Sequence, residues 1–182
     1  MFFTSIVFFG FKELGVYFYC MFVSVSYVIE DCVKYIDSYS KAFNGTTAYQ
    51  SLYDTSTTSN NLELTAKLKS TGNKGFGLLF SKTGSSTSNI LREGVTGSSI
   101  THCTVNSGSD DTTTTGNTYS ANSDMNIKIK IKSDNSYEAY IDNTLVKSGT
   151  SSVISQLRYV EIMSWNSSSQ TVTITDLKIK PL

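Results

Sequence analysis

Residues 126–132 decide the fold class, because their sequence, Asn-Ile-Lys-Ile-Lys-Ile-Lys, alternates apolar and polar side chains. Successive side chains of a β-strand point to opposite faces of a sheet, so this segment has one apolar face and one polar face. Three more segments in the last third of the chain share the pattern: residues 137–142, 157–165 and 171–180. Together they predict antiparallel strands with one buried face and one solvated face.

The middle of the chain adds a predicted hairpin. Residues 62–68, Leu-Glu-Leu-Thr-Ala-Lys-Leu, place their apolar side chains on one face, and residues 75–80, Gly-Phe-Gly-Leu-Leu-Phe, return after a turn. The remaining candidates are strands at 21–29, 90–92 and 99–105, a strand or helical turn at 33–36, and long polar connections at 38–60 and 107–123. Roughly nine or ten strands without an amphipathic helix predict an all-β fold, a two-sheet antiparallel β-sandwich.

Length and composition restrict the class of protein. The chain has 182 residues and a formal net charge of zero, which suits one domain and gives no positive field for a nucleic-acid partner. Polar loops rich in Ser, Thr, Asn and Gly are common in extracellular and virion proteins. We therefore expect an extracellular, cell-surface or virion location.

The N-terminus differs from the rest, because residues 1–29 are almost wholly apolar and only Lys12 and Glu13 interrupt them. A signal peptide would begin with basic residues, and the uncharged run that follows Glu13 is short for a membrane span of about 20 residues. The aromatic residues before Cys20 do not suit a lipoprotein signal. Signal or anchor, an extension before a start at Met21, and a buried core segment all stay open. We assign residues 1–20 to an apolar extension and 21–182 to the sandwich domain.

The three cysteines leave two interpretations open. Cys32 and Cys103 either form a disulfide or are two buried free thiols. The chain has no Cys-x-x-Cys spacing, and His102 is its only histidine, so no zinc site is expected.

The order of the predicted strands resembles the concanavalin-A-like, LamG-like jelly-roll superfamily of lectins and glucanase-related domains. The hairpin carries part of the resemblance, since its second strand ends in a Gly-x-x-Phe pattern at residues 77–80. The other matching segments are the strand pair at 127–132 and 137–142 and the closing strands at 159–165 and 172–180. Asn143 stands where the turn of the family usually has glycine. The resemblance covers about residues 21–182 and implies a jelly roll with a bias toward glycan binding. This fold hosts many functions, so function has to come from a site.

Catalysis is not expected. The glucanases of this superfamily carry two glutamates and an aspartate on one strand, and retaining hydrolysis needs carboxyl groups about 5–5.5 Å apart. Glu138 with Asp142 and the isolated Glu161 do not match that pattern, and Asp142 suits a turn. The sequence therefore predicts a protein that is not an enzyme.

A sugar-binding face is predicted on residues 157–165. If Val160 and Ile162 face the core, the opposite face presents aromatic rings and a carboxylate, which suit the C–H faces and the hydroxyl groups of a sugar. Tyr140 and Glu138 face away from the core on a segment that we expect to be a neighbouring strand. The predicted ligand-binding residues are Trp165, Tyr159, Tyr140, Glu138 and Glu161. In the alternative, the register is reversed and Trp165 belongs to the core.

A structural calcium ion is a further candidate, since many carbohydrate-binding jelly rolls tie their first strand to their last with Ca²⁺. Asp176 interrupts the apolar alternation of the last strand, and Glu30 and Asp31 end the first one. Calcium takes six to eight oxygen ligands, of which these three carboxylates would supply part. The alternative is a β-bulge at Asp176 with solvated acidic side chains.

A row of lysines follows one face of the same strands: Lys128, Lys130 and Lys132, with Lys178 and Lys180. Such a row either attracts acidic glycans or phosphate, or keeps the sheet soluble and blocks pairing at its edge.

The sequence predicts a non-catalytic carbohydrate-binding module on a cell or virion surface. Its partner would be a glycan or cell-surface polysaccharide, bound by aromatic stacking and hydrogen bonds. The alternative is a structural or adhesion module of a phage tail, capsid or surface protein, attached to a larger assembly.

Overall fold

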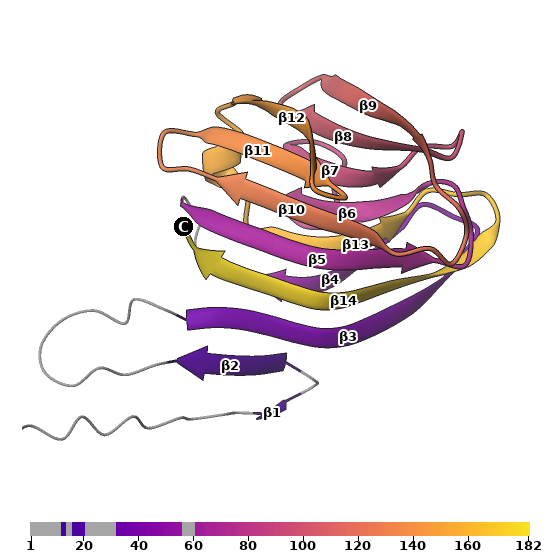
Figure 1. The fold of residues 1–182 in the computed structure, drawn as a ribbon, viewed down its shortest axis with the longest axis horizontal. Coiled ribbons are helices and arrows are strands. Elements are labelled where there is room, and N and C mark those ends of the chain that lie inside the picture. The colour runs from indigo at the N-terminus through magenta and orange to yellow at the C-terminus, as the bar shows by residue number, and fades with distance from the viewer. Residues whose placement is uncertain (1–11, 14–15, 21–31, 56–60) are drawn as a thin grey trace, which may run out of the picture.

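The structure is a computed structural model that describes residues 12–13, 16–20, 32–55 and 61–182, with side chains from residue 34 onwards. Its strands form an eight-stranded sheet and a six-stranded sheet, packed face to face as a sandwich (Figure 1). Every strand pairing is antiparallel. The predicted all-β sandwich is thereby confirmed.

The eight-stranded sheet has the order β1-β2-β3-β14-β5-β10-β11-β12. Its strands are β1 (Lys12–Glu13), β2 (Val16–Cys20), β3 (Cys32–Asn44), β14 (Ser169–Pro181), β5 (Leu62–Ser70), β10 (Met125–Ile131), β11 (Ser136–Ile141) and β12 (Thr144–Thr150). The six-stranded sheet has the order β4-β13-β6-β7-β8-β9. Its strands are β4 (Ala48–Asp54), β13 (Tyr159–Ser164), β6 (Phe76–Ser81), β7 (Ile90–Val95), β8 (Ile100–Asn106) and β9 (Asp110–Thr118).

Between β12 and β13 the chain makes a single 3₁₀ turn, Ile154–Gln156. Within the described ranges, no helix is both long and apolar enough to cross a membrane.

The alternation of β10 produces the burial that the sequence predicts. Ile127, Ile129 and Ile131 are buried in the core, and the lysines between them lie on the outer face. β10 is paired along its whole length with β5, which buries its own leucines on the same side. The apolar stripes of these strands therefore form one wall of the core, and the six-stranded sheet supplies the other.

The predicted polar connections at 38–60 and 107–123 are wrong, because each contains a strand. β3 continues to Asn44 and β4 follows, while β9 pairs with β8 at the edge of the six-stranded sheet. β9 is largely exposed and holds a run of threonines, so it lacks the apolar alternation of a half-buried strand. Threonine nevertheless favours extended backbone, and the hydrogen bonds to β8 complete the strand.

Only part of the N-terminal predictions falls within the described residues. The expected strand at 21–29 lies outside the described residues. β2 pairs with β3, so strand pairing extends into residues 1–20, which we assigned to the apolar extension. The boundary between the extension and the sandwich domain stays a prediction. Cys103 is a buried free thiol, which agrees with the interpretation of Cys103 as unpaired.

One carboxyl group lies inside the apolar core. Glu93 on β7 is fully buried, and neither of its oxygens has a hydrogen-bond partner among the described residues. It lies opposite Cys103 of β8 in the strand register. Burial without a compensating charge raises the pKa of Glu93 well above its ordinary range. The shift favours the neutral form of this carboxyl, which leaves a polar group without a partner in the core.

Two adjacent glycines in the middle of the six-stranded sheet allow β6 and β7 to approach closely. Gly77 and Gly94 are partners in the strand register. A Cβ atom at Gly94 would collide with the carbonyl oxygen of Phe76 and lie 2.7 Å from the Cα atom of Gly77. A side chain at either position would push the two strands apart.

We expect the substitution Gly94→Ala to lower the free energy of unfolding by about 2–3 kcal/mol, because the new methyl group meets backbone that cannot move independently. Denaturant unfolding measures the change. Gly97→Ala is the matched control, since a Cβ there has nothing within 4 Å, and it should change stability by less than about 0.5 kcal/mol. Equal stabilities of the two variants would contradict the close approach of the strands.

Candidate functional site

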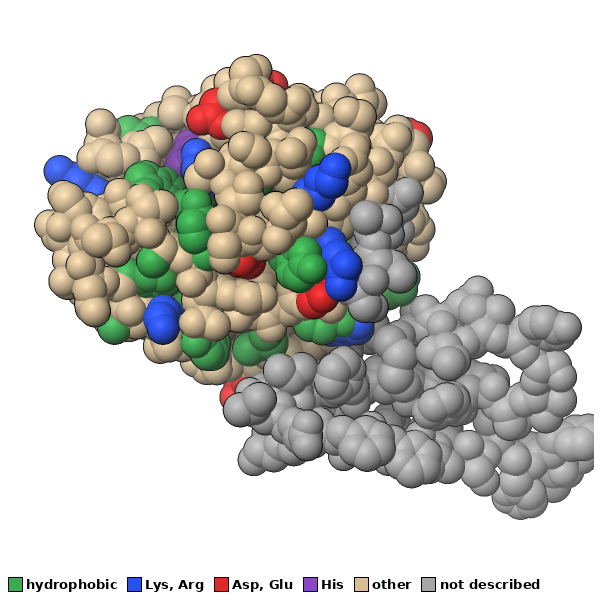
Figure 2. Space-filling view, turned by 180° about the vertical axis from the view of Figure 1, so that it is seen from behind, with side chains coloured by type: hydrophobic (Ala, Val, Ile, Leu, Met, Phe, Trp, Pro, Cys, Tyr) green, Lys and Arg blue, Asp and Glu red, His purple; other side chains and the backbone are tan. Residues whose placement is uncertain are grey.

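The candidate site is the outer face of the six-stranded sheet, which Figure 2 views from behind the orientation of Figure 1. Val160 and Ile162 of β13 belong to the main core, whereas Met163 and Trp165 belong to a separate small cluster on the opposite face. The predicted register of residues 157–165 is therefore confirmed, and the reversed register is wrong.

Trp165 lies on this face directly after the end of β13. Its side chain is half-buried, with the guanidinium carbon of Arg92 at 4.7 Å from the ring centroid. The imidazole of His102 meets the indole edge-to-face, with 6.0 Å between centroids and an interplanar angle of 82°. Cation–π and edge-to-face contacts of this kind hold an aromatic ring in one orientation. We call Trp165, Arg92 and His102 the Trp165 platform.

The platform exists because of the two central glycines. Trp165 follows β13 and His102 lies on β8, with β6 and β7 between these strands. Neighbouring strands are about 4.8 Å apart, so the two backbones are separated by about 14 Å. Gly77 and Gly94 lie between Met163 and His102 in the strand register. Because neither has a side chain, the indole ring and the imidazole can meet above them.

Burial sets the charges of the platform. The pKa of His102 is lowered to about 4, mainly by burial and then by the nearby charge of Arg92, so His102 is neutral at pH 7. Burial also lowers the pKa of the Arg92 guanidinium, which nevertheless remains charged. The platform therefore carries one positive charge next to an aromatic ring.

Two buried polar atoms of the platform have no hydrogen-bond partner within the described part of the chain. They are Nε of Arg92 and Nδ1 of His102. On Arg92, Nη2 donates to the hydroxyl of Thr104 at 3.4 Å. Buried polar atoms are nearly always paired in folded proteins, so these two unpaired atoms cost stability at the platform.

Glu161 and Tyr159 lie on the same face but support a loop. Glu161 is buried, and its carboxylate accepts hydrogen bonds from the Ser81 hydroxyl at 3.0 Å and from the Ser85 N–H at 2.9 Å. A Cβ on Gly84 of this loop would lie 3.6 Å from the ring of Tyr159. The expectation of an exposed carboxylate at residue 161 is wrong, because the loop between β6 and β7 covers it.

Tyr140 and Glu138 lie on the other side of the molecule. Their strand, β11, pairs with β10 and β12 in the eight-stranded sheet, so it is not a neighbour of β13. The prediction of one site shared with Trp165 is wrong, because the 3₁₀ turn carries the chain from one sheet to the other. Glu138 instead accepts hydrogen bonds from the Lys132 ammonium and the Tyr140 hydroxyl, both at 2.7 Å.

No sequence pattern pointed to Arg92 or to the position of His102 beside Trp165. Both faces of β7 and β8 are largely buried, which removes the alternation that reveals the outward side of a strand. Tyr49 of β4 also reaches this face, where it packs on the small cluster with Trp165. It lay in a segment that we predicted to be a connection.

The predicted calcium site is only partly described. Asp176 has a positive φ of 53° at a register shift between β14 and β5, which is the expected bulge. Its carboxylate contacts the Lys67 ammonium at 3.1 Å and accepts a hydrogen bond from the Tyr35 hydroxyl at 3.2 Å. Glu30 and Asp31 lie outside the described residues. Among the residues described, no three acidic, cysteine or histidine side chains are placed to hold a metal.

Calcium therefore stays a prediction with a simple test. An ion that binds only the folded state raises the melting temperature by mass action, so treatment with EDTA should lower it. Excess Ca²⁺ should restore the original value, and Mg²⁺ serves as the control. An unchanged melting temperature would contradict a structural calcium ion.

No family model and no curated protein matches the chain. Solved structures do match. The carbohydrate-binding module CBM66 from Bacillus subtilis superposes with a TM-score of 0.53 at 13% identity, covering 83% of this chain and 82% of the module. A structure from work on endo-acting O-glycanases of the human gut microbiota that initiate mucin breakdown gives a TM-score of 0.55 at 10% identity, covering 82% of each chain. The chain shares the jelly-roll β-sandwich fold of these structures.

A third match is part of a larger protein. The binding domain of botulinum neurotoxin DC, in complex with SialylT, gives a TM-score of 0.52 at 11% identity. The superposition covers 80% of this chain and 39% of the toxin domain. At such identities the comparison establishes the fold alone, and the site residues have to be argued from their own geometry.

The buried imidazole of His102 makes the free energy of unfolding depend on pH. Its folded pKa of about 4 lies below the ordinary value of 6.5, so its contribution is complete above pH 6.5 and is lost as the pH falls toward 4. The loss is about 3 kcal/mol. In His102→Gln, which does not titrate, this part of the loss should disappear from denaturant unfolding measured between pH 7 and pH 4. Asp124→Asn, an exposed carboxylate, is the control and should keep it. A variant profile identical to the native one would contradict a buried neutral imidazole.

Proposed function

We propose that the chain is a non-catalytic carbohydrate-binding module whose ligand lies on the Trp165 platform. The observation that carries the proposal is the half-buried indole of Trp165 held between Arg92 and His102. A fixed, flat aromatic ring suits the C–H face of a sugar ring, and preorganisation of that ring lowers the entropic cost of binding.

Polar groups around the platform suit the hydroxyl groups of the same sugar. Arg92 supplies a charged guanidinium beside the indole ring, with Nη2 donating to the hydroxyl of Thr104. On the β9 side, Thr114 is exposed and lies opposite His102 in the strand register, while the hydroxyls of Thr104 and Thr112 bond to each other at 2.8 Å. Donors and acceptors beside an aromatic ring are the combination that neutral sugars need for orientation.

We do not propose that the chain hydrolyses its ligand. Hydrolysis of a glycoside needs two carboxyl groups on either side of one bond. On the six-stranded sheet the carboxylate of Glu161 is hydrogen-bonded to Ser81 and Ser85, and Glu93 is fully buried in the core. The fold is shared with structures named for carbohydrate-binding modules and O-glycanases, which favours a glycan as the ligand. Such a ligand implies a working position outside a cell or on a virion.

The test is a glycan array with the purified chain, followed by calorimetry on an uncharged oligosaccharide that binds. Trp165→Ala should weaken that binding at least about 10-fold, since central aromatic residues dominate the binding energy of such faces. Tyr140→Ala is the matched control, because it truncates an aromatic side chain on the opposite sheet. Both variants should keep the native circular dichroism spectrum.

Two outcomes would contradict the proposal. If Trp165→Ala binds as tightly as the native chain, the platform is not the site. If no glycan binds and the chain self-associates stably, the alternative of a structural or adhesion module is favoured.

A further inference from the structure

A second surface lies on the outer face of the eight-stranded sheet, away from the Trp165 platform. It is a groove of about 410 Å³, within the range of ligand pockets of roughly 300–1,000 Å³. Most of its lining side chains are polar or charged: Thr65, Lys67, Asn126, Lys128, Asn143, Asp176 and Lys178, with Ala66 and Ile127. We call it the lysine groove.

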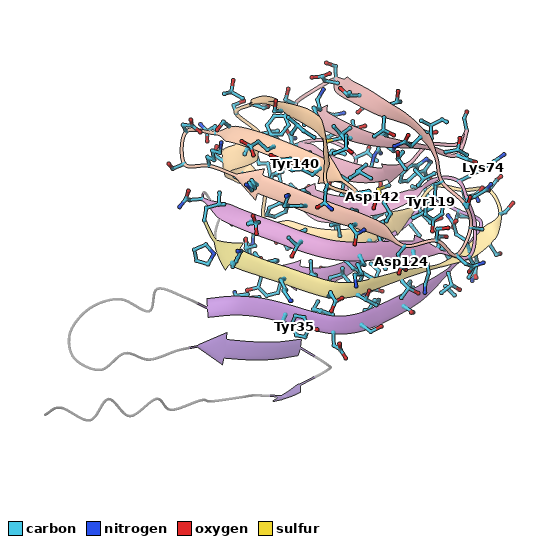
Figure 3. All side chains as sticks on the ribbon, in the orientation of Figure 1. Tyr35, Lys74, Tyr119, Asp124, Tyr140 and Asp142 are labelled. Carbon is cyan, nitrogen blue, oxygen red and sulfur yellow. The ribbon has the colours of Figure 1, made fainter. Side chains whose placement is uncertain are left out.

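The strand register places a symmetric row of side chains across this groove. Tyr35 of β3 pairs with Lys178 of β14, which pairs with Thr65 of β5. Thr65 pairs in turn with Lys128 of β10, which pairs with Tyr140 of β11. The row therefore reads tyrosine, lysine, threonine, lysine, tyrosine on one face of five adjacent strands. Figure 3 shows Tyr35 and Tyr140 on either side of the intervening strands.

The two tyrosines hold the two lysines apart. Nζ of Lys128 lies 4.3 Å from the ring centroid of Tyr140, and Nζ of Lys178 lies 5.5 Å from that of Tyr35. Each lysine thus leans outward, away from Thr65, toward an aromatic face that attracts its charge. Thr65 in the centre is short, so the groove opens above it with an ammonium group on each side.

These two lysines differ from the other lysines around them. On the same face Lys67 is paired with Asp176 at 3.1 Å, Lys180 with Glu63 at 3.2 Å, and Lys132 with Glu138 at 2.7 Å. For Lys128 and Lys178 no carboxylate of the described residues lies within salt-bridge distance. Counting all four charged side chains of the lining, the groove keeps a net charge of two positive.

Fixed amides lie at the end of the groove near β10. Asn126 donates from its backbone N–H and its side-chain amide to one carboxylate oxygen of Asp142, at 2.9 and 3.0 Å. Asn143 follows in the turn between β11 and β12, with a positive φ of 65°. Its side chain lines the groove as a neutral partner for hydroxyl groups. The groove thus combines two ammonium groups without salt bridges with neutral hydrogen-bonding groups.

We propose that the lysine groove binds an acidic saccharide, with a carboxylate or sulfate group above Thr65 between Lys128 and Lys178 and sugar hydroxyls at Asn126 and Asn143. This surface is separate from the Trp165 platform and does not depend on it. The two tyrosines are positioning residues, because they orient the lysines and take no part in the anion contact. The lysine row is thereby assigned a ligand in addition to its effect on solubility.

The experiment measures binding of three probes to the full chain by NMR and calorimetry at low salt: a sulfated oligosaccharide, an oligogalacturonate and inorganic sulfate. The amide signals of Thr65, Asn126 and Asn143 should move with either saccharide. Lys128→Gln and Lys178→Gln should each weaken binding about 10-fold, because each removes one charged hydrogen-bond donor. Lys180→Gln is the matched control, since it removes a lysine of the same face that is paired with Glu63.

Three outcomes would overturn the proposal. Lys180→Gln could weaken binding as much as the other two variants, which means diffuse attraction without a site. Inorganic sulfate could bind as tightly as the saccharides, which means a site for a free anion only. The saccharides could instead shift the signals of Trp165, which means binding on the platform. Trp165→Ala separates the two proposals, because it should leave binding of the acidic saccharides in the groove unchanged while weakening binding of an uncharged glycan.

Discussion

The apolar layer between the two sheets is the constraint on which the rest of the structure depends. In β10 and β5, every second side chain is buried against the six-stranded sheet, and the side chains between them lie on the outer face. A slip of one residue in the pairing would exchange these faces. The burial of Ile129 therefore also fixes the outward direction of Lys128. Core packing and the geometry of the candidate sites are in this sense one property of the sheet.

The two outer faces of the sandwich differ in physical character. On the eight-stranded sheet most charged side chains are paired across strands, and two lysines are held by tyrosine rings. On the six-stranded sheet the outer face is itself largely buried, with Leu79 and Met163 packed beneath Tyr49 and Trp165. We propose the first face for an anion and the second for a flat, neutral ring. One fold can thus present two chemistries because its two sheets are covered differently.

Two buried ionisable groups, Glu93 on β7 and His102 on β8, make the free energy of unfolding depend on pH in opposite directions. Glu93 has a raised pKa, so its contribution is complete at low pH and is lost as the pH rises through that value. His102 has a lowered pKa, and its contribution is lost as the pH falls. An apolar residue at position 93 would avoid the cost in the core. His102 and Arg92 belong to the platform, where each leaves one buried polar atom without a partner among the described residues.

The sequence by itself determined the two-sheet fold, the inward side of β5, β10, β11, β13 and β14, and the exposed lysine row, because a half-buried strand shows its faces through alternation. It could not determine β9, which is almost wholly polar, or the outward side of β7 and β8, where both faces are buried. Only the tertiary structure decided which strands are neighbours. It places Tyr140 and Trp165 on different sheets and brings Arg92 and His102 to the indole ring. The physical reason is that the order of strands depends on where the chain crosses between the sheets, and the alternation of side chains within a strand does not contain that information.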